Sequence, residues 1–432
     1  MRLVACLPLC LMMGCTAPRT RAWLLNEVDA RTGFTLGSGV DGGIAPKVVL
    51  DDGLGADEAV ALALWQSPVL HAELTQLATA LATFDEAHRP ANPRLNNFLF
   101  PLDVRQLALV LFIPLESLWQ LPSRISAATA ELESTAESLV QLVLDTERTV
   151  RQSHADAVLA ERRIDVLLRG AQTWREALEL AQARAASGDI AEADVDQLRV
   201  ELTWADDAVQ RAEHESVMAR ARLTTWVGST LPGLASSPLT DGELAPAETL
   251  ASLQTRSLAR RPDLTAAAFA VNAAAARADW ERTKVFSLFL SVDGQAPVGG
   301  LTQHFAPGFQ AELPLFSQNQ GGIGRADAAV SRAAQRYLAT RLTVLQDVAV
   351  AHAMVERAQH SVLAARRVSQ WLEHSVQMSG HAFERGAESY TVVVDAVRRT
   401  IDASLRELEL EAELRRAEAD LIRSVGGRES TP

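Results

Sequence analysis

The chain has 432 residues, of which 48% are hydrophobic and only two are tyrosine, and it carries a formal net charge of -13. This acidic balance disfavours nucleic acid as a partner, because phosphate binding needs a basic face and the arginines here alternate with Glu and Asp. The three cysteines, Cys6, Cys10 and Cys15, all lie in the first fifteen residues. A disulfide framework or a cysteine metal site in the rest of the chain is therefore excluded.

Residues 1–14 have the pattern of a signal peptide. Arg2 supplies a positive charge, and an apolar stretch follows that is too short to span a bilayer as a permanent helix. Gly14-Cys15 resembles the processing site of a bacterial lipoprotein, in which the cysteine is acylated and becomes the new N-terminus. The alternative is an ordinary cleaved secretory signal with an incidental cysteine.

Residues 15–52 read as an irregular N-terminal linker. They contain Gly37, Gly39 and Gly42 in the spacing of a dinucleotide-binding fingerprint. That fingerprint needs a preceding strand and a helix that opens on its last glycine, whereas Gly43-Ile-Ala-Pro46 follows here. We therefore expect no nucleotide site in this segment.

The first repeat is predicted over residues 53–240. It starts with a helix from Ala56 to His88 that has a joint at Pro68, and continues with a β-hairpin over residues 94–115. The second strand of this hairpin is apolar on both faces, which argues against one lipid face and one water face.

The helical run over residues 123–226 is the longest feature of the first repeat. Its apolar positions recur at alternating spacings of three and four, which is typical of a seam between packed helices. The run is interrupted once, at Ser187-Gly188-Asp189. Gly readily ends a helix, and Asp189 is a candidate cap for the next one, so the sequence predicts a long helical hairpin.

The second repeat, over residues 241–427, follows the same plan, and residues 428–432 form a tail. A helix from Leu253 to Thr283 with Pro262 near its start precedes two strands within 286–316, where apolar and polar residues alternate. A second helical hairpin covers 324–425 and breaks at Arg385-Gly386-Ala387. Gly386 follows Gly188 by 198 positions.

Helix lengths predict an elongated cylinder. The descending helices and the paired shorter helices that would return each span roughly 95 to 105 Å at 1.5 Å per residue. We predict a mainly α fold with a small β part. Four strands are too few to close a barrel, so the strand layer requires several copies of the chain.

Several motifs together resemble the TolC family of bacterial outer-membrane efflux proteins, over essentially the whole chain after the signal. They are the two hairpin tips within 184–195 and 383–393, the junction Leu313-Pro-Leu-Phe-Ser-Gln-Asn-Gln-Gly-Gly322, the tract Arg261-Pro-Asp-Leu264 and the terminal Val425-Gly-Gly427.

The resemblance implies a lipid-anchored homotrimer in the outer membrane, with a twelve-stranded β-barrel and a helical tunnel that extends into the periplasm. It implies two further partners, a periplasmic adaptor protein and an inner-membrane pump of the resistance-nodulation-division type. Such a channel needs no cofactor. The sequence shows no HExxH or P-loop motif and no other catalytic constellation, and its scattered histidines predict no metal site.

Site residues follow from the resemblance. The tips, Ser187, Gly188 and Asp189 with Arg385, Gly386 and Ala387, match the positions where the adaptor docks. Asp395 matches an acidic position that lines the closed end of the tunnel, and its companion position is Val392 here. Asp194 and Asp196 of the first tip are the alternative constriction.

The exported substrate stays open at this stage. The Asn319-Gln320-Gly321 tract resembles the heavy-metal branch of the family, and an acidic chain suits cation passage. Multidrug export or type I protein secretion are alternatives. A periplasmic adaptor would have one helical hairpin instead of two, and a non-channel coiled-coil lipoprotein would lack the alternating strands.

Overall fold

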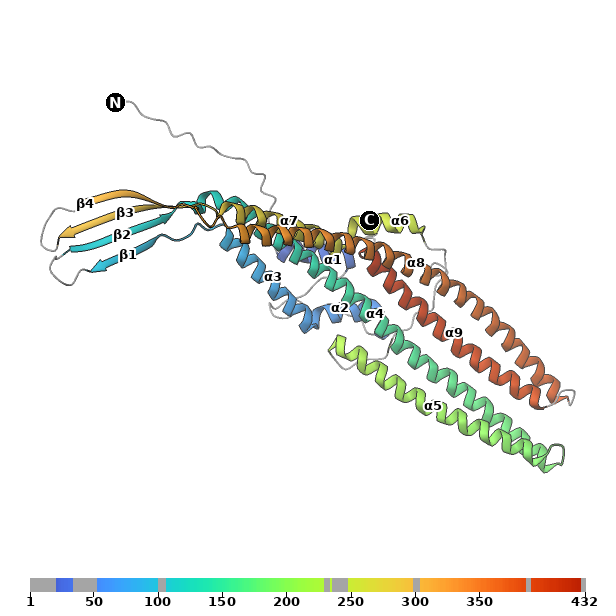
Figure 1. Ribbon diagram of the computed structural model, residues 1–432. Coiled ribbons are helices and arrows are strands. Elements are labelled where there is room, and N and C mark those ends of the chain that lie inside the picture. Colours follow the sequence, from blue (N-terminus) through green and yellow to red (C-terminus); the bar gives the residue numbers. More distant parts are fainter. Residues whose placement is uncertain are drawn as a thin grey trace.

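A computed structural model describes residues 21–33, 53–99, 106–228, 234, 248–297, 304–385 and 390–428. It is a long rod with a four-stranded sheet at one end and the tips of two helical hairpins at the other (Figure 1). The predicted fold class, mainly α with a small β part, is confirmed. We call the half of the rod nearer the sheet the upper half and the half nearer the tips the lower half.

The helices that return toward the sheet are short and jointed, as the prolines predict. In the first repeat they are α2 (Ala56–Gln66) and α3 (Pro68–Ala87), and in the second they are α6 (Leu250–Arg260) and α7 (Pro262–Thr283). Each proline occupies the first position of its helix, where its missing N–H leaves no bond unmade. The Oγ of Ser67 caps α3 by accepting a hydrogen bond from the Leu70 N–H, at 3.3 Å.

Two long hairpins form the rest of the rod. The first joins α4 (Glu116–Ala186) to α5 (Glu192–Val227), and the second joins α8 (Gln320–Glu384) to α9 (Tyr390–Val425). With 71 residues, α4 is about 107 Å long. In the upper half the helices lie side by side in the order α3, α4, α7, α8; in the lower half the order is α5, α4, α9, α8.

The expected start of α4 at Ser123 is wrong. The helix begins at Glu116 and contains Pro122. Contacts from the second repeat hold the turn before this proline: Trp119 stacks on Phe286, and the Trp280 Nε1–H donates to the Gln120 Oε1 at 3.3 Å. These tertiary contacts offset the single backbone hydrogen bond that the proline removes.

The expected irregular linker over residues 15–52 also needs correction, because it contains a helix, α1 (Arg21–Thr32). Val28 of α1 is fully buried, and Trp23 and Leu25 pack against the same core cluster. Burial of these side chains in the core beside α4 stabilises a segment whose local sequence is a weak helix former. The glycine fingerprint at residues 37–42 lies outside the described residues.

The main core lies at the middle of the rod, where α2 and the ends of α3 and α5 cover α4. It contains Leu64, Leu70, Leu132, Val143 and Leu223, all nearly fully buried. A second cluster near the tips joins both hairpins. None of the described helices combines the length and the apolar character that a membrane-spanning helix requires.

The strands form one antiparallel sheet in the order β1 (Arg94–Leu99), β2 (Gln106–Pro114), β3 (Ser287–Pro297) and β4 (His304–Glu312). β2 pairs with β3, so the two repeats meet at the centre of the sheet. Residues paired across an antiparallel ladder share a face. One face is therefore apolar at most of its positions, with Asn97 of β1 as an exception; it carries Leu95, Leu111, Ile113, Leu288, Leu290, Val292, Pro307 and Phe309.

The opposite face is mixed. It carries Ser291, Asp293, Gln310 and Glu312 from the second repeat, and Val110 and Phe112 from β2. β2 carries apolar residues on both of its sides, as expected. Its odd-numbered residues belong to the apolar face of the sheet, whereas Val110 and Phe112 lie on the mixed face, where a membrane strand ordinarily has polar residues.

Candidate functional site

The first hairpin tip is a tight, exposed turn. Gly188 has φ +83°, and its N–H donates to the Ala185 carbonyl at 3.0 Å while the Asp189 N–H donates to the Arg184 carbonyl at 3.0 Å. This pair of bonds is a Schellman motif, which favours glycine because only glycine takes this backbone conformation without strain. No atom lies within 4 Å of the place that a Gly188 Cβ would occupy. The tip therefore presents a free backbone surface.

Asp189 does not cap the next helix, contrary to the expectation. The residue before α5 is Ala191, and no side chain bonds the first turn of that helix. Asp189 instead accepts a hydrogen bond from the Ser187 hydroxyl at 3.3 Å. The Asp189 carboxylate therefore closes the turn locally and stays exposed.

The second tip is described in part. Arg385 follows the end of α8 and is exposed, and its N–H donates to the His381 carbonyl at 3.4 Å. Gly386 and Ala387 lie outside the described residues. Of the six predicted docking residues, the structure therefore places four, all of them exposed.

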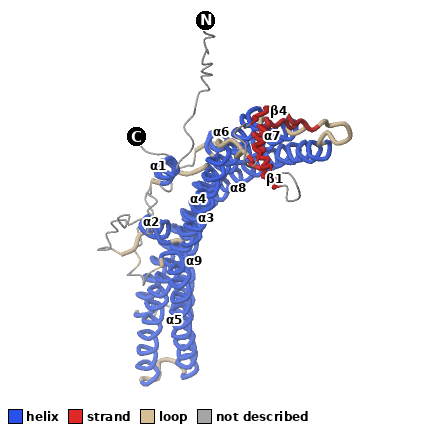
Figure 2. Tube along the Cα trace, turned by 90° about the vertical axis from the view of Figure 1, so that its left-hand side faces the viewer, coloured by secondary structure: helices blue, strands red, loops and turns tan. Residues whose placement is uncertain are grey.

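The predicted constriction residues lie in the first turns of α5 and α9. Val195 and Leu198 of α5 share a buried cluster with Val394 and Val397 of α9, so these turns lie at the same level of the rod. Figure 2 shows both hairpins ending together at the foot of the molecule.

Each constriction aspartate for which the structure gives a partner is paired on its own helix. Asp395 pairs with Arg399 at 2.8 Å and Asp196 pairs with Arg199 at 2.8 Å, and all four side chains are more than half exposed. Val392 is 43% exposed. Exposed pairs of this kind hold a side chain weakly, so both carboxylates stay accessible to ions from solution.

The sequence reading missed an ion pair between the two hairpins. Arg398 of α9 bonds Glu201 of α5 across α4, and the Glu201 side chain is 11% exposed. Close to it, Gly170 of α4 lets Ile401 pack where a Cβ would come within 2.7 Å of the Ile401 Cδ1. These contacts fix the two hairpins against each other above the tips.

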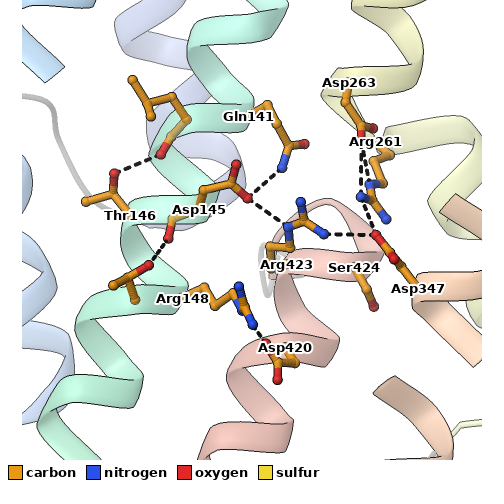
Figure 3. A network of polar contacts seen from close by, with 12 residues as sticks. Gln141, Asp145, Thr146, Arg148, Arg261, Asp263, Asp347, Asp420, Arg423 and Ser424 are labelled. Carbon is orange, nitrogen blue, oxygen red and sulfur yellow. Dashed lines mark hydrogen bonds and ion pairs between the residues drawn. The ribbon is translucent and has the colours of Figure 1, made fainter. Parts of the chain in front are cut away.

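A polar network at the middle of the rod was also missed, although the Arg261-Pro-Asp tract pointed to it. Arg261, at the joint of α6 and α7, is 1% exposed and bonds Asp263 at 3.0 Å and Asp347 of α8 at 2.7 Å. Arg423 of α9 bonds the same Asp347 at 2.9 Å and Asp145 of α4 at 2.7 Å (Figure 3). One connected set of charges thus joins α4, α7, α8 and α9.

Burial works to lower the pKa of Arg423, because it disfavours the charged guanidinium. The hydrogen bond to Asp145 and the charges of Asp145 and Asp347 outweigh burial and raise the pKa. The terminal glycines lie beside the network. Gly426 has φ +91°, and a Cβ there would lie 3.0 Å from the Arg260 backbone. The end of α9 can therefore approach the α6–α7 joint closely because no side chain intervenes.

A second network joins α2 and the chain end to the outer side of α4. Arg151 bonds Asp57 at 2.6 Å and Glu147 at 2.9 Å, and Arg428 bonds Asp57 at 3.1 Å. Burial works to raise the pKa of Asp57, but the two arginines outweigh it and hold the pKa below its usual value. The neighbouring His154 is buried and bonds the Leu54 carbonyl at 2.8 Å; burial lowers its pKa.

The Asn319 tract, expected to mark the heavy-metal branch, has a structural role at the start of α8. Asn319 has φ +56°, and its Nδ2 donates to the Glu281 carbonyl at 2.9 Å and to the Glu281 carboxylate at 2.8 Å. Hydrogen bonds from Lys284 and Asn319 lower the pKa of Glu281. The tract thus ties the end of α7 to the beginning of α8.

Histidines make ordinary contacts where the structure describes them. The His352 ring lies 2.9 Å from the Glu248 carbonyl and 3.5 Å from the Glu356 carboxylate. The described part of the chain holds no group of three His, Cys, Asp or Glu that could bind a metal ion.

Solved outer-membrane channels share this architecture. The structure of CusC superposes with a TM-score of 0.76 and 18% identity, and the match covers 86% of this chain and 92% of that one. The channel OprN superposes with a TM-score of 0.72 and 19% identity over 86% and 90% of the two chains. The fold is therefore that of a TolC-like channel.

Sequence comparison points the same way. The family model described as outer membrane efflux protein matches residues 253–427. The cobalt-zinc-cadmium resistance protein CzcC of Cupriavidus metallidurans is 24% identical over 318 residues, which are 73% of this chain and 75% of CzcC. This chain is therefore similar in sequence to outer membrane efflux proteins over residues 253–427 and has the fold of TolC-like channels.

From this similarity we expect a trimeric outer-membrane channel that extends into the periplasm. The sheet agrees with this assembly, because β1 and β4 are open edges and three copies supply the twelve strands of a closed barrel. The apolar face of the sheet is then the lipid face, and the mixed face lines the lumen.

Proposed function

We propose that this protein is the exit duct for metal cations in a tripartite efflux system with a periplasmic adaptor and a resistance-nodulation-division pump. The observation that supports a duct is the position of the two hairpin tips. Both are exposed and lie at the same height at one end of the rod, and the sheet with its apolar face lies at the other end. The cation assignment rests on the similarity to CzcC over 73% of this chain. Like its relatives, the protein would do no bond chemistry.

A second substrate class has support of its own. The pyoverdine export outer membrane protein OpmQ of Pseudomonas putida is 26% identical over 275 residues, which are 60% of this chain and 56% of OpmQ. The duct would then carry an organic molecule. A strain that lacks the gene distinguishes the two: sensitivity to cobalt, zinc or cadmium alone supports the cation duct, and sensitivity to organic compounds alone supports the alternative.

We further propose that processing removes residues 1–14 and leaves an acylated Cys15, followed by the two TolC-like repeats at 53–240 and 241–427. Cys15 lies outside the described residues. The proposal is supported by Gly14-Cys15 behind a short apolar stretch and by the absence of any later cysteine.

The first prediction concerns this anchor. Cys15→Ser should abolish metabolic labelling with palmitate and leave the amount of trimer nearly unchanged, because the apolar face of the sheet holds the protein in the membrane independently. Cys10→Ser, which changes a cysteine within the signal segment, is the matched control and should keep the label. Palmitate incorporation into the Cys15→Ser protein would contradict the lipoprotein assignment.

We propose that Asp395 forms a ring of three carboxylates at the closed end of the tunnel, with Val392 in place of a second acidic ring. Its support is the family position, the accessible carboxylate and its place in the first turns of α9 near the tip. Three like charges that face one narrow lumen attract cations and repel one another, and Arg399 compensates them in part.

The second prediction tests this ring. Asp395→Ala should lower the cation preference of single-channel conductance and weaken block by multivalent cations, while the trimer stays equally stable because no buried contact is lost. Asp279→Ala, which removes an exposed carboxylate of α7 in the upper half of the rod, is the control and should change neither property. If Asp395→Ala leaves conductance and block unchanged in an assembled trimer, the constriction is to be sought at Asp194 or Asp196.

A further inference from the structure

Large apolar side chains lie exposed along the open edge of the lower half on α8. They include Met354 (49% exposed), Val368 (43%), Trp371 (70%) and Met378 (59%). The face of α8 that packs against α9 is different, and it contains Val355, Ala358 and Val362. Trp371 and Met378 lie on the far side of α8 from this face and have no partner within the described chain.

The other open edge, on α5, has a matching feature. Trp204 is 63% exposed and lies near Val200, which is 45% exposed. Leu202, two residues earlier, packs into the cluster that α5 shares with α4 and α9. Two residues of helix correspond to a rotation of about 200°, so Trp204 points away from its own subunit.

Trp371 on α8 also points away from its own subunit. Ser369, two residues earlier, is 6% exposed and lies one heptad after Val362, on the face toward α9. Trp371 is therefore also turned by about 200° from the intrasubunit face. Because α5 ascends from the tip and α8 descends to it, equal rotations bring both indole rings to the same side of a seam between neighbouring subunits.

The two tryptophans stand at the same level. Trp204 is twelve residues after the start of α5 at Glu192, and Trp371 is thirteen residues before the end of α8 at Glu384. At 1.5 Å per residue these positions are about 18 and 20 Å from the ends of their helices. The two tips are themselves level, because both hairpins contribute to one buried cluster there.

Charges on the same edges are complementary. Asp207 of α5 is fifteen residues from the start of its helix, and Arg367 of α8 is seventeen residues from the end of its own. Asp207 pairs with Arg211 on its own helix, and the Arg367 Nε donates to the Leu363 carbonyl at 3.2 Å. Both charged groups retain capacity for a partner across the edge, one turn above the tryptophans.

We propose that Trp204 of one subunit and Trp371 of its neighbour pack together across the subunit boundary and close the lower helical tunnel at this level. The inference rests on the trimeric assembly of the family and assigns to it a specific aromatic contact. A second copy of this chain is the occupant because the two edges match: each carries an exposed tryptophan at the same height and on the same side, beside charges of opposite sign. Stacked or edge-to-face indoles would hide both rings from water.

Cysteine crosslinking tests the contact. The variant with Trp204→Cys and Trp371→Cys, treated in membranes with a short bifunctional thiol reagent, should migrate as covalent dimers and trimers on denaturing gels. Either single substitution should stay monomeric. The two residues lie on opposite edges of one subunit, which a short reagent does not span. A crosslink within one chain would in any case migrate as a monomer, so covalent dimers and trimers report contacts between subunits.

A mismatched pair supplies the control. Trp204→Cys with Met354→Cys uses an exposed α8 position thirty residues from the helix end, about 27 Å from the required level, and should give no covalent dimer. Asp207→Cys with Arg367→Cys keeps both tryptophans and should also crosslink between subunits. If neither matched pair crosslinks in an assembled trimer, or if either crosslinks to an adaptor instead, the contact does not exist.

These outcomes are independent of the substrate and of the pump. A channel that exports normally without the matched crosslinks would overturn the tryptophan contact alone. A crosslinked trimer that exports nothing would leave the contact intact and would remove the proposed function.

Discussion

Replacing Gly188 or Gly386 with tryptophan should abolish export while the trimer still reaches the outer membrane. At Gly188 nothing beyond the adjoining residues lies within 4 Å of a Cβ and the turn is exposed, so a large side chain can extend into solvent. The left-handed backbone adds a strain of about 1–2 kcal/mol, which an extensive trimer tolerates. The ring instead occupies the surface where the adaptor approaches, and even a small displacement there prevents docking.

Gly188→Asn is the matched control for the first tip. Asparagine accepts a left-handed backbone and is small, so export should stay close to that of the unchanged protein. The measurement is resistance of the complemented strain, together with the amount of trimer in the outer membrane. Full resistance in a strain whose protein carries tryptophan at both tips would remove the tips from the mechanism.

Arg261→Met should lower the temperature at which the trimer unfolds more than any exposed substitution does. Arg261 is 1% exposed and neutralises Asp263 and Asp347 at once. Removal of one partner from an ion pair costs about 3–5 kcal/mol where the remaining charge is itself buried, and Asp263 and Asp347 are 27% and 31% exposed. Asp347 retains Arg423, so the lower end of this range is expected here.

Arg282→Met is a close comparison. Arg282 also contacts two carboxylates, Asp279 and Asp327, at 2.8 and 2.6 Å, but it is 49% exposed. Exposed ion pairs contribute about 0–1 kcal/mol to the free energy of unfolding, so the unfolding temperature of the Arg282→Met trimer should hardly change. Circular dichroism of the solubilised trimers at one protein concentration measures both. Equal effects of the two substitutions would mean that the mid-rod network contributes no more to stability than surface pairs.

Local rules predicted the joints and tips well. Proline at positions 68 and 262 starts a helix in each repeat, and glycine at 188 ends one, because these residues restrict or free the backbone by themselves. The same rules failed at Pro122 and at α1. There the outcome depends on burial against distant segments, such as Trp119 on Phe286 and Val28 in the main core.

Contacts between the two repeats could not be predicted from the sequence. Arg398 and Glu201 are 197 positions apart, and Arg423 and Asp145 are 278 positions apart. The resemblance named Arg261-Pro-Asp as a marker without giving its reason. The structure supplies that reason, because the joint of α6 and α7 is where one arginine reaches carboxylates on two helices.

The central claim is that substrate leaves the periplasm through this chain. Its most direct test is the export of zinc from loaded cells of a strain that lacks the gene but keeps the pump and the adaptor. The account predicts that zinc stays in the cells, that the unchanged protein restores its release into the medium, and that the Gly188→Trp protein does not. Equal release with and without the gene, for zinc and for the organic substrates alike, would contradict the account.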